Sequence, residues 1–405
     1  MRVIYIHREI EKKIKTFLKQ FPVVILTGPR QTGKSTTLKE VFVPRYKYIS
    51  LEEPTIRENI LSDPKLFLDT LPDRVILDEI QYIPELLPYL KMKVDENRTL
   101  KGKFILTGSQ QFQMMKNVTE TLAGRTGLLR LLPFSYVETK EIFLKKYKLN
   151  PLKIFIHTCL RGSYPEIFIH NKYDARAWYD SYIQTYLERD IRNIYNIGNL
   201  RDFHRFLRLL ASRCSQILNL SNIASDLGVA VNTVKNWLSI LEASYIIYLL
   251  PPYYKNIGKR ITKSPKIYFT DCGLLCHLLN IKKENELLNH PLLGAIFENY
   301  CIQETVKLFE NEGLRPEIYY LRTKTGKEID LILEVTEGVY PIEIKFTKTP
   351  TLKTIEPLLY FYREIKKIKL LKGFLFCLVD TKSKVTKDIS ALNIDSYIEE
   401  ICKII

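Results

Sequence analysis

The first residues whose types and spacing could do chemistry are residues 28–35, which read Gly-Pro-Arg-Gln-Thr-Gly-Lys-Ser. This stretch fits the P-loop pattern G-x-x-x-x-G-K-[ST], in which backbone N–H groups surround phosphate oxygens. Lys34 would place a positive charge on the β and γ phosphates, and Ser35 would offer a hydroxyl to Mg²⁺. An apolar run precedes the pattern and a helical stretch follows it, so the sequence predicts a nucleoside triphosphate site. The expected nucleotide contacts are Gly28, Pro29, Arg30, Gln31, Thr32, Gly33, Lys34, Ser35 and Thr36.

Two adjacent acids supply the other half of such a site. Asp78 and Glu79 directly follow the apolar run 74–77. At the end of a strand beside a P-loop, we expect Asp78 to hold the Mg²⁺ and Glu79 to polarise the attacking water. The pair therefore predicts that the nucleotide is hydrolysed as well as bound.

A second group of charged residues lies near the C-terminus. Residues 328–333 and 341–345 read as two strands of a hairpin that turns at Glu337 and Gly338, and the hairpin carries Asp330, Glu343 and Lys345. Alternating charged and apolar residues are also typical of any half-exposed hairpin. Lys324 and Lys327 are either phosphate contacts or solvated side chains.

The elements that must position these groups follow from the pattern of apolar runs. Five β-like runs fill the first third of the chain, and helical stretches separate them: 23–27, 46–51, 74–77, 103–107 and 128–132. This alternation predicts an α/β domain with a parallel sheet and the nucleotide at the carboxyl ends of its strands. Residues 136–217 read as helical and are interpreted as a lid or connector.

Residues 220–250 predict a winged helix-turn-helix. Ser221 is expected to cap a first helix, Gly228 to turn the chain, and Asn232 to cap a second helix at 233–242. A strand at 245–250 and a basic stretch would form the wing. The basic residues are Lys255, Lys259, Arg260, Lys263 and Lys266. The second helix either reads the major groove of DNA or serves as a spacer between domains, and its candidate contacts are Asn232, Thr233, Lys235 and Asn236.

The length, net charge and composition of the chain limit how many domains it has, what it binds and where it is found. A length of 405 residues predicts about three domains of ordinary size, and a net charge of +16 favours a polyanionic partner, nucleic acid above all. The sequence has no apolar run near the roughly 20 residues that span a bilayer and no signal-peptide pattern, so we expect a cytoplasmic protein that does not enter membranes. The 7 scattered cysteines are expected to be reduced and structural.

Several motifs together resemble one family. Residues 24–34, 76–81, 105–110, 122–135, 162–166 and 266–271 are similar to those of prokaryotic AAA-type ATP-binding proteins with a conserved C-terminal domain of unknown function. The resemblance covers nearly the whole chain. It implies an additional-strand P-loop core and ATP with Mg²⁺ as cofactors. The expected domains are a P-loop parallel-sheet ATPase core (1–135), a helical lid or connector (136–217), a winged helix-turn-helix (218–262) and an α+β restriction-endonuclease-like domain (263–405).

In AAA-type ATPases a polar residue after the strand at 103–107 senses the γ-phosphate. Ser109 is the candidate here, with Gln110 beside it. Arg125 is the candidate arginine finger, acting in cis or on a neighbouring subunit, and Arg130 is the second choice. A surface arginine that pairs with a phosphate or an acid elsewhere is the alternative of nearly equal weight.

In the restriction-endonuclease-like fold, an Asp followed by Glu-x-Lys is a metal site. The resemblance implies that Asp330 and Glu343 bind Mg²⁺, with Glu298 adding a carboxylate from a helix, and that Lys345 steadies the hydroxide or the phosphate. Such a domain can also keep its acids for metal-dependent DNA binding without cleavage.

The sequence as a whole favours an ATPase that acts on DNA, with metal-dependent nuclease activity in the C-terminal domain as an open question. The first alternative is an ATP-dependent switch that binds a protein partner through a non-catalytic C-terminal domain. The second is a defence or toxin-like nuclease gated by ATP. A homo-oligomer is compatible with each of these.

Overall fold

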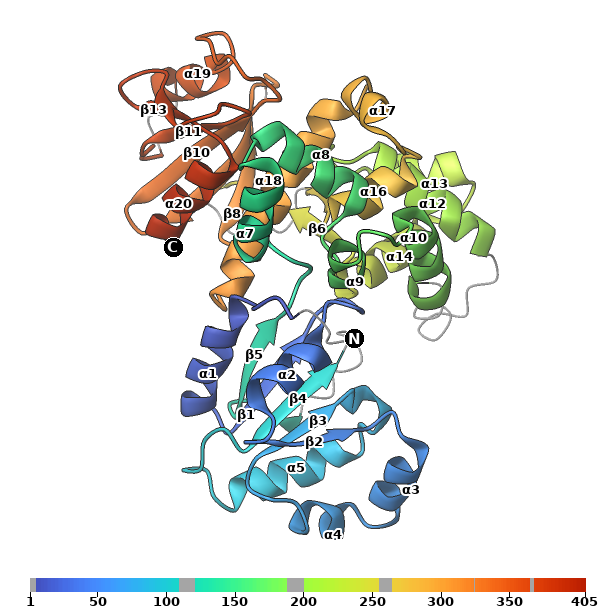
Figure 1. The fold of residues 1–405 in the computed structure, drawn as a ribbon. Coiled ribbons are helices and arrows are strands. Elements are labelled where there is room, and N and C mark those ends of the chain that lie inside the picture. The colour runs from blue at the N-terminus through green and yellow to red at the C-terminus, as the bar shows by residue number, and fades with distance from the viewer. Residues whose placement is uncertain (1–4, 109–120, 188–199, 255–263, 324, 365–367) are drawn as a thin grey trace.

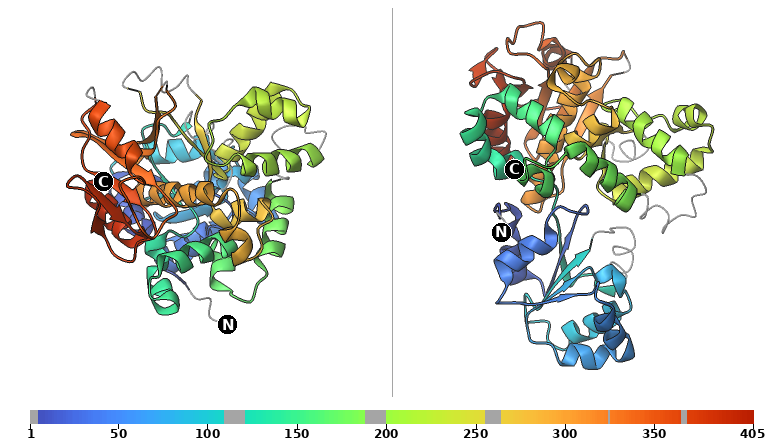
Figure 2. Two further views of the ribbon diagram at one scale, coloured as in Figure 1. Left: turned by 90° about the horizontal axis from the view of Figure 1, so that it is seen from above. Right: turned by 45° about the vertical axis from the view of Figure 1, so that its right-hand side comes forward.

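A computed structural model describes residues 5–108, 121–187, 200–254, 264–323, 325–364 and 368–405. Figure 1 shows the N-terminal part at the bottom, the C-terminal sheet at the upper left and helices α10, α12, α13 and α14 at the upper right. The right-hand view of Figure 2, which is turned about the vertical axis, again shows the N-terminal part below the rest of the chain. No helix of the described residues is both long enough and apolar enough to cross a membrane.

The N-terminal part is built on a five-stranded sheet of order β2-β3-β4-β1-β5, in which every neighbouring pair is parallel. Its strands are β1 (Val23–Thr27), β2 (Lys47–Ser50), β3 (Val75–Asp78), β4 (Phe104–Gly108) and β5 (Thr126–Arg130). Each of the five predicted runs overlaps one strand, and β4 lies between β1 and β3 as an additional strand. The predicted α/β class with a parallel P-loop sheet is confirmed.

Helices cover both faces of this sheet and bury its apolar residues. They are α1 (Ile10–Gln20), α2 (Lys34–Phe42), α3 (Pro54–Ser62), α4 (Pro64–Asp69), the short 3₁₀-helix η1 (Ile80–Tyr82) and α5 (Leu86–Asp95). Side chains alternate between the faces of a strand, so Val23 and Ile25 face one core while Val24 and Leu26 face the other. Parallel strands buried on both faces read as continuous apolar runs, which is why the sequence located them.

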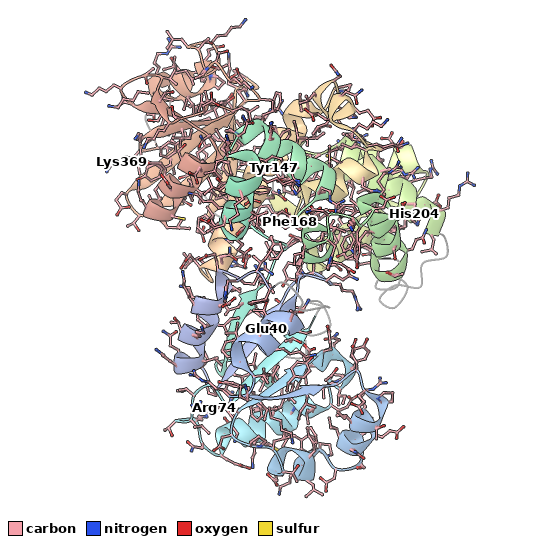
Figure 3. The ribbon with its side chains drawn as sticks, in the orientation of Figure 1. Glu40, Arg74, Tyr147, Phe168, His204 and Lys369 are labelled. Atoms are coloured by element: carbon pink, nitrogen blue, oxygen red, sulfur yellow. The ribbon has the colours of Figure 1, made fainter. Side chains whose placement is uncertain are left out.

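The next part is helical, as expected. Its elements are α7 (Tyr136–Tyr147), α8 (Pro151–Arg161), α9 (Pro165–Ile169), α10 (Ala175–Tyr182), a π-helical turn η2 (Ile183–Leu187) and α12 (Leu200–Ser212). Ser135 and Glu138 form a capping box at the start of α7. Tyr147 and Phe168, labelled in Figure 3, both contact His157 within an aromatic cluster.

The region predicted as a winged helix contains α13 (Leu220–Leu227), α14 (Val231–Ala243) and a two-stranded sheet of β6 (Ile247–Leu250) and β7 (Lys266–Phe269). The predicted caps are wrong. Asn219 caps α13 in place of Ser221, and α14 begins one residue before Asn232, with Ala230 at its N-cap. Gly228 does end α13 in a left-handed conformation.

The predicted basic wing falls on residues 255–263, which lie outside the described residues. Lys266 belongs to β7 and is buried, so its assignment to a basic surface is wrong. Two buried or half-buried acids compensate its charge, which the local sequence did not indicate.

The C-terminal part is a six-stranded mixed sheet of order β12-β13-β11-β10-β9-β8. Its strands are β8 (Ile318–Arg322), β9 (Glu328–Val335), β10 (Gly338–Ile344), β11 (Gly373–Phe376), β12 (Ser383–Lys384) and β13 (Ile389–Leu392). The strands β9 and β10 form the predicted antiparallel hairpin, and Leu331 lies opposite Ile342. The helices of this region are α16 (Cys272–Leu278), α17 (Glu284–Leu288), α18 (Leu293–Asn311), α19 (Glu356–Glu364) and α20 (Ile394–Ile404).

One apolar core extends from Leu132 to Ile401 and joins the helical part to one face of the C-terminal sheet. The long helix α18 runs through this core and also contacts β5 of the N-terminal sheet. Burial of this kind is the main favourable term in holding two parts of a protein together. The helical part and the C-terminal sheet therefore fold as one packed body.

Candidate functional site

The P-loop lies at the carboxyl end of β1, where the parallel sheet predicts a nucleotide. Two of its positions require glycine. Gly28 has a φ of 142°, and a Cβ there would stand 2.1 Å from the carbonyl oxygen of Leu131. Gly33 adopts a left-handed conformation with φ of 87° immediately before α2. The backbone can therefore turn tightly and direct the first N–H groups of α2 toward an anion.

The Lys34 side chain is folded back onto the loop. Its Nζ donates hydrogen bonds to the carbonyl oxygens of Gly28 at 3.0 Å and Pro29 at 2.7 Å. Burial lowers the pKa of Lys34 to about 8, against the opposing effect of the Glu79 and Asp78 carboxylates. A bound phosphate would replace the two carbonyl oxygens as the partner of this amine.

The acids at the end of β3 are fixed by neighbouring strands. Asp78 is buried and accepts hydrogen bonds from the hydroxyls of Thr107 on β4 and Tyr48 on β2. Thr107 also accepts a hydrogen bond from the backbone N–H of Glu79 at 2.9 Å. Glu79 itself has φ of 61°, a left-handed conformation that is uncommon outside glycine and that directs the chain into η1.

Thr107 and Tyr48 are functional candidates that the sequence interpretation missed. Burial and the Asp78 carboxylate raise the pKa of Tyr48, so its hydroxyl stays a hydrogen-bond donor at neutral pH. Both residues lie within predicted strands, but a contact between three strands has no signal in a single sequence. Had the order of the strands been known, it would have been enough to place the ends of β4 and β3 side by side.

The predicted sensor residues Ser109 and Gln110 lie outside the described residues. The predicted arginine finger is Arg125. Its Nε and Nη2 atoms donate hydrogen bonds to the two carboxylate oxygens of Asp95, at the end of α5, over 2.7 and 2.9 Å. The second choice, Arg130, pairs with Glu310 of α18 at 2.8 Å. Each arginine thus has an acid within the same chain, and the arginine-finger role stays a prediction.

Residues outside the motif hold the P-loop in place. Arg8 is buried, and its Nη1 donates to the carbonyl oxygen of Thr32 at 2.7 Å while its Nε donates to Glu138 at 2.8 Å. Pro165 lies 3.9 Å from the Cβ position of Gly33, which brings the first residue of α9 against the nucleotide site. These contacts join the P-loop to the helical part.

A second contact reaches the end of β1. The hydroxyls of Thr27 and Tyr245 are 2.9 Å apart, and Tyr245 follows α14 in a left-handed conformation with φ of 56°. The guanidinium of Arg130 lies over the Tyr245 ring at 5.8 Å. The region predicted as a winged helix therefore contacts the strand that carries the P-loop.

The C-terminal acids and lysine meet at the ends of β9 and β10. Lys345 lies 2.6 Å from a carboxylate oxygen of Glu343 and 3.5 Å from Asp330. Asp330 also accepts the backbone N–H of Ile344 at 2.9 Å. The other carboxylate oxygen of Glu343 is buried and has no hydrogen-bond partner among the described residues.

The charges in this group shift one another's titration. Burial and the Asp330 carboxylate raise the pKa of Glu343 well above its usual value. Burial lowers the pKa of Lys345, but Asp330 and Glu343 outweigh this effect and raise it. Lys327, the other lysine noted in the sequence, pairs with exposed Glu356 at 2.9 Å, and Lys324 lies outside the described residues.

Glu298 of α18 approaches from one side but is held by other partners. Its carboxylate accepts hydrogen bonds from Lys266 at 3.0 Å and from the hydroxyl of Tyr268 at 2.5 Å. Within the described ranges, no three side chains of the His, Cys, Asp or Glu type are arranged to hold a metal ion. Glu298 is therefore not gathered with Asp330 and Glu343 into a ligand group, because Lys266 and Tyr268 bind it.

Comparison with known families assigns three segments of the chain. A model described as an AAA domain matches residues 20–140. Two models described as domains of unknown function, DUF8612 and DUF4143, match residues 152–285 and 293–397. The match at 20–140 includes the P-loop, Asp78 at the end of β3 and Glu79 after it. It supports a P-loop ATPase of the AAA type.

Two curated relatives are similar over most of the chain. The uncharacterized proteins Rv2008c of Mycobacterium tuberculosis and Mb2031c of Mycobacterium bovis are each 32% identical over 346 residues. Each alignment covers 85% of this chain and 75% of the relative.

Three solved structures are also similar to parts of this chain. The Walker-type ATPase PABY2304 of Pyrococcus abyssi has a TM-score of 0.45 at 18% identity. The alignment covers 67% of this chain and 95% of that protein's chain. The RuvB Holliday junction branch migration motor of Thermotoga maritima has a TM-score of 0.31 at 18% identity, with coverages of 60% and 89%. The ORC1 protein of Aeropyrum pernix, solved in complex with DNA, has a TM-score of 0.28 at 13% identity, with coverages of 68% and 93%.

Proposed function

Because this chain belongs to the family of Rv2008c and Mb2031c and carries an AAA domain, we propose that it hydrolyses ATP and uses the nucleotide state to act on DNA. The ATPase part of the proposal is supported by the site at the end of the parallel sheet. There the P-loop lies beside Asp78 and Glu79, and Thr107 contacts both acids. The DNA part is supported by the acids and lysine of the C-terminal hairpin.

In the proposed ATPase reaction, this chain's residues bind and orient the triphosphate. Lys34 leaves the carbonyl oxygens of Gly28 and Pro29 and contacts the β and γ phosphates. Ser35 and Asp78 would hold a Mg²⁺ ion, which neutralises charge on the phosphates when it is bound. Glu79 orients a water molecule in line with the bond to be broken.

The observation that carries the DNA proposal is the group formed by Asp330, Glu343 and Lys345. Two carboxylates side by side, one with a buried and unpartnered oxygen, offer hard oxygen donors of the kind that Mg²⁺ prefers. Lys345 lies next to both and is 42% exposed at its side chain, so it can approach a phosphate. A bound Mg²⁺ would supply Lewis-acid activation, and these residues fit its requirements as a two-carboxylate site.

The helix α18 is the proposed connection between the two sites. Near one end it carries Glu298, which binds Lys266 of β7. Near the other, Glu310 pairs with Arg130 at the end of β5, and Lys307 donates to the carbonyl oxygen of Phe134 at 2.9 Å. A shift of β5 with the nucleotide state would move this helix, since packed elements move as rigid units.

The test is incubation of the purified protein with supercoiled plasmid and with linear DNA in Mg²⁺ or Mn²⁺, with and without ATP. Glu343→Ala and Lys34→Ala serve as variants, and Glu356→Ala, an exposed acid of α19, serves as the matched control. Cleavage that is lost in Glu343→Ala but kept in Glu356→Ala supports a nuclease, and its dependence on ATP and Lys34 supports coupling. Intact DNA together with ATPase activity that DNA does not stimulate contradicts the proposal.

A second candidate function is supported by the same lysines. Lys266 and Lys345 neutralise Glu298, Glu343 and Asp330 within the fold, as expected if the acids are structural. The chain would then be an ATP-dependent switch that docks a protein partner. ATPase stimulation by a cell-extract protein and not by DNA, unaffected by Glu343→Ala, favours this function.

A further inference from the structure

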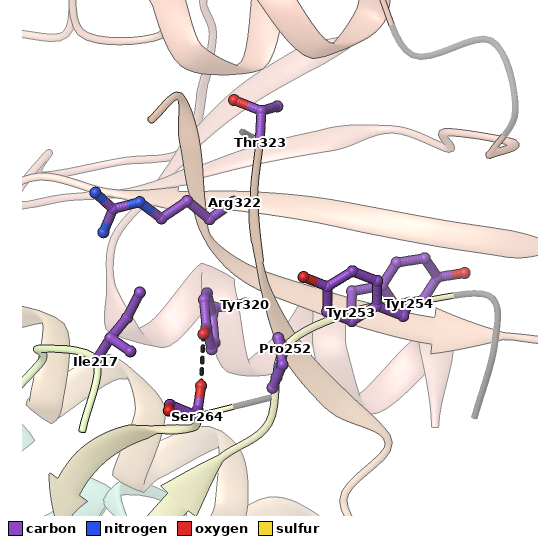
Figure 4. A pocket seen from close by; sticks show the side chains of 8 residues that line it. All are labelled: Ile217, Pro252, Tyr253, Tyr254, Ser264, Tyr320, Arg322 and Thr323. Atoms are coloured by element: carbon purple, nitrogen blue, oxygen red, sulfur yellow. Dashed lines mark hydrogen bonds between the residues drawn. The ribbon is translucent and has the colours of Figure 1, made fainter. Parts of the chain in front are cut away.

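A cavity of about 290 Å³ opens between the chain that follows β6 and the edge strand β8, and it has no role in the activities proposed above. Figure 4 shows its lining, in which Tyr320 lies in the middle, Tyr253 and Tyr254 lie together on one side, and Arg322 extends toward the other side. The residues that matter are Tyr253, Tyr254, Tyr320, Arg322 and Ser264. They come from the chain just after β6, from the residue two before β7 and from the edge strand β8.

Main-chain hydrogen bonds build the cavity floor. The chain after β6 runs alongside the free edge of β8, where the N–H of Tyr253 donates to the carbonyl oxygen of Tyr320 at 2.7 Å. The N–H of Tyr320 donates in return to the carbonyl oxygen of Pro251 at 3.0 Å. The Tyr320 hydroxyl donates to the carbonyl oxygen of Ser264 at 2.7 Å, so its ring is fixed. The cavity is therefore preformed.

The lining combines aromatic surface with positive charge. Tyr320 is buried at the floor and has the amine of Lys266 over its ring at 5.6 Å, while Tyr254 is half-buried at the side. Arg322 at the rim is 50% exposed and lies 3.6 Å from Glu328. Exposed ion pairs of this kind contribute little, so the guanidinium is available to a phosphate. Aromatic faces with a nearby cation are the usual platform for unpaired bases of nucleic acids.

The cavity is connected to the acids and lysine of β9 and β10 through Glu328. Arg322 of β8 lies opposite Glu328 of β9 in the sheet register, and Glu328 is two residues before Asp330 on the same strand. Lys266 binds Glu298 and Glu328, and its amine also lies over the ring of Tyr320 in the cavity. A nucleic acid strand with one phosphate at Lys345 would carry a neighbouring base toward the cavity.

We propose that this cavity binds one unpaired nucleobase of a single-stranded nucleic acid, stacked on Tyr254, with Arg322 on the adjoining phosphate. The inference rests on the proposed action on DNA and names the form of DNA that the C-terminal site takes. The net charge of +16 favours a polyanion over a peptide as the occupant.

The test is fluorescence anisotropy of the full chain with three labelled probes: a twelve-residue oligothymidylate, an abasic strand of equal length and a duplex. We expect the thymidylate to bind at least about fivefold more tightly than the abasic strand, because one stacked base is worth about 1–3 kcal/mol. Tyr254→Ala should remove this preference without weakening abasic binding, and Tyr254→Phe should restore it. Arg322→Ala should weaken both single strands and lower the salt slope by about 1.

Arg205→Ala is the matched control, since Arg205 is an exposed arginine of α12 that pairs with Asp202. The proposal is overturned if the abasic strand binds as well as the thymidylate, or if Tyr254→Ala leaves the preference intact. A cavity that takes a peptide side chain would give the first of these results, because no base would then contact Tyr254. Plasmid cleavage by a wild-type protein that shows no preference for the thymidylate over the abasic strand would refute the cavity alone. Base-dependent binding without cleavage or ATPase stimulation would instead refute only the proposed action on DNA.

Discussion

Replacing Arg8 by methionine should destabilise the N-terminal part and weaken nucleotide binding together. The side chains of Arg8 and Glu138 are 3% and 0% exposed, and the pair is 2.8 Å apart. Arg8 also donates to the carbonyl oxygens of Thr32 at 2.7 Å and Leu132 at 2.6 Å. Its removal therefore leaves a buried carboxylate and two backbone acceptors without their cation.

The magnitude follows from what remains around Glu138. Breaking a buried ion pair on one side costs about 3–5 kcal/mol because the other charge is left uncompensated. Glu138 keeps the backbone N–H groups of Ser135 at 2.7 Å and Glu9 at 3.0 Å as donors, so the lower end of the range, about 3 kcal/mol, is expected. The lost hydrogen bond to Thr32 should weaken nucleotide binding about tenfold, because a bond to a charged donor is worth about 1.5–3 kcal/mol.

The assay is urea unfolding followed by far-UV circular dichroism, with titration of a fluorescent ATP analogue on the same samples. Lys12→Met is the control, since Lys12 forms an exposed pair with Glu9 and should change the free energy of unfolding by less than about 1 kcal/mol. A double-mutant cycle with Glu138→Gln should give a coupling of about 2 kcal/mol, in the range of contacting residues. Equal effects of Arg8→Met and Lys12→Met would refute the reasoning.

Three further predictions concern the nucleotide site and the aromatic cluster. Lys34→Ala should abolish triphosphate binding, and Glu79→Gln should bind ATP but stop its hydrolysis, as measured by filter binding and phosphate release; normal turnover by either variant contradicts the assignment. Thr107→Val should lower kcat about tenfold with little change in KM, because it removes one of the two hydroxyl hydrogen bonds to Asp78 and the acceptor of the Glu79 backbone N–H, and Thr107→Ser should restore it; wild-type kcat in Thr107→Val counts against this role. Burial lowers the pKa of His157 from 6.5 to about 4, so the neutral ring favours folding above pH 6.5 and this stability is lost as pH falls toward 4. His157→Phe should flatten this dependence in urea midpoints between pH 7 and pH 4, and an unchanged pH profile would exclude His157 as its source.

Much of the N-terminal part could be predicted from the sequence because its signals are local. A strand buried on both faces reads as an apolar run, and the P-loop has a fixed spacing that depends on backbone geometry at Gly28 and Gly33. Asp78 and Glu79 followed from their place at the end of such a run. The hairpin of β9 and β10 was found for the same reason, from alternation and a turn at Gly338.

The tertiary structure decided how distant residues pair, because such contacts leave no trace in the spacing of a single sequence. Arg8 reaches Glu138, Tyr245 reaches Thr27, and Lys266 turned out to be a buried partner of Glu298 although it reads as a surface lysine. The cap at Asn219 was missed because several polar residues nearby are equally able to cap, and the start of α14 was missed because Ala230 has no side-chain group that could cap a helix. Sequence by itself determined which chemical groups the chain carries and which strands and helices present them. The folded chain determined which of those groups meet, since only packing sets the distances between strands far apart in sequence.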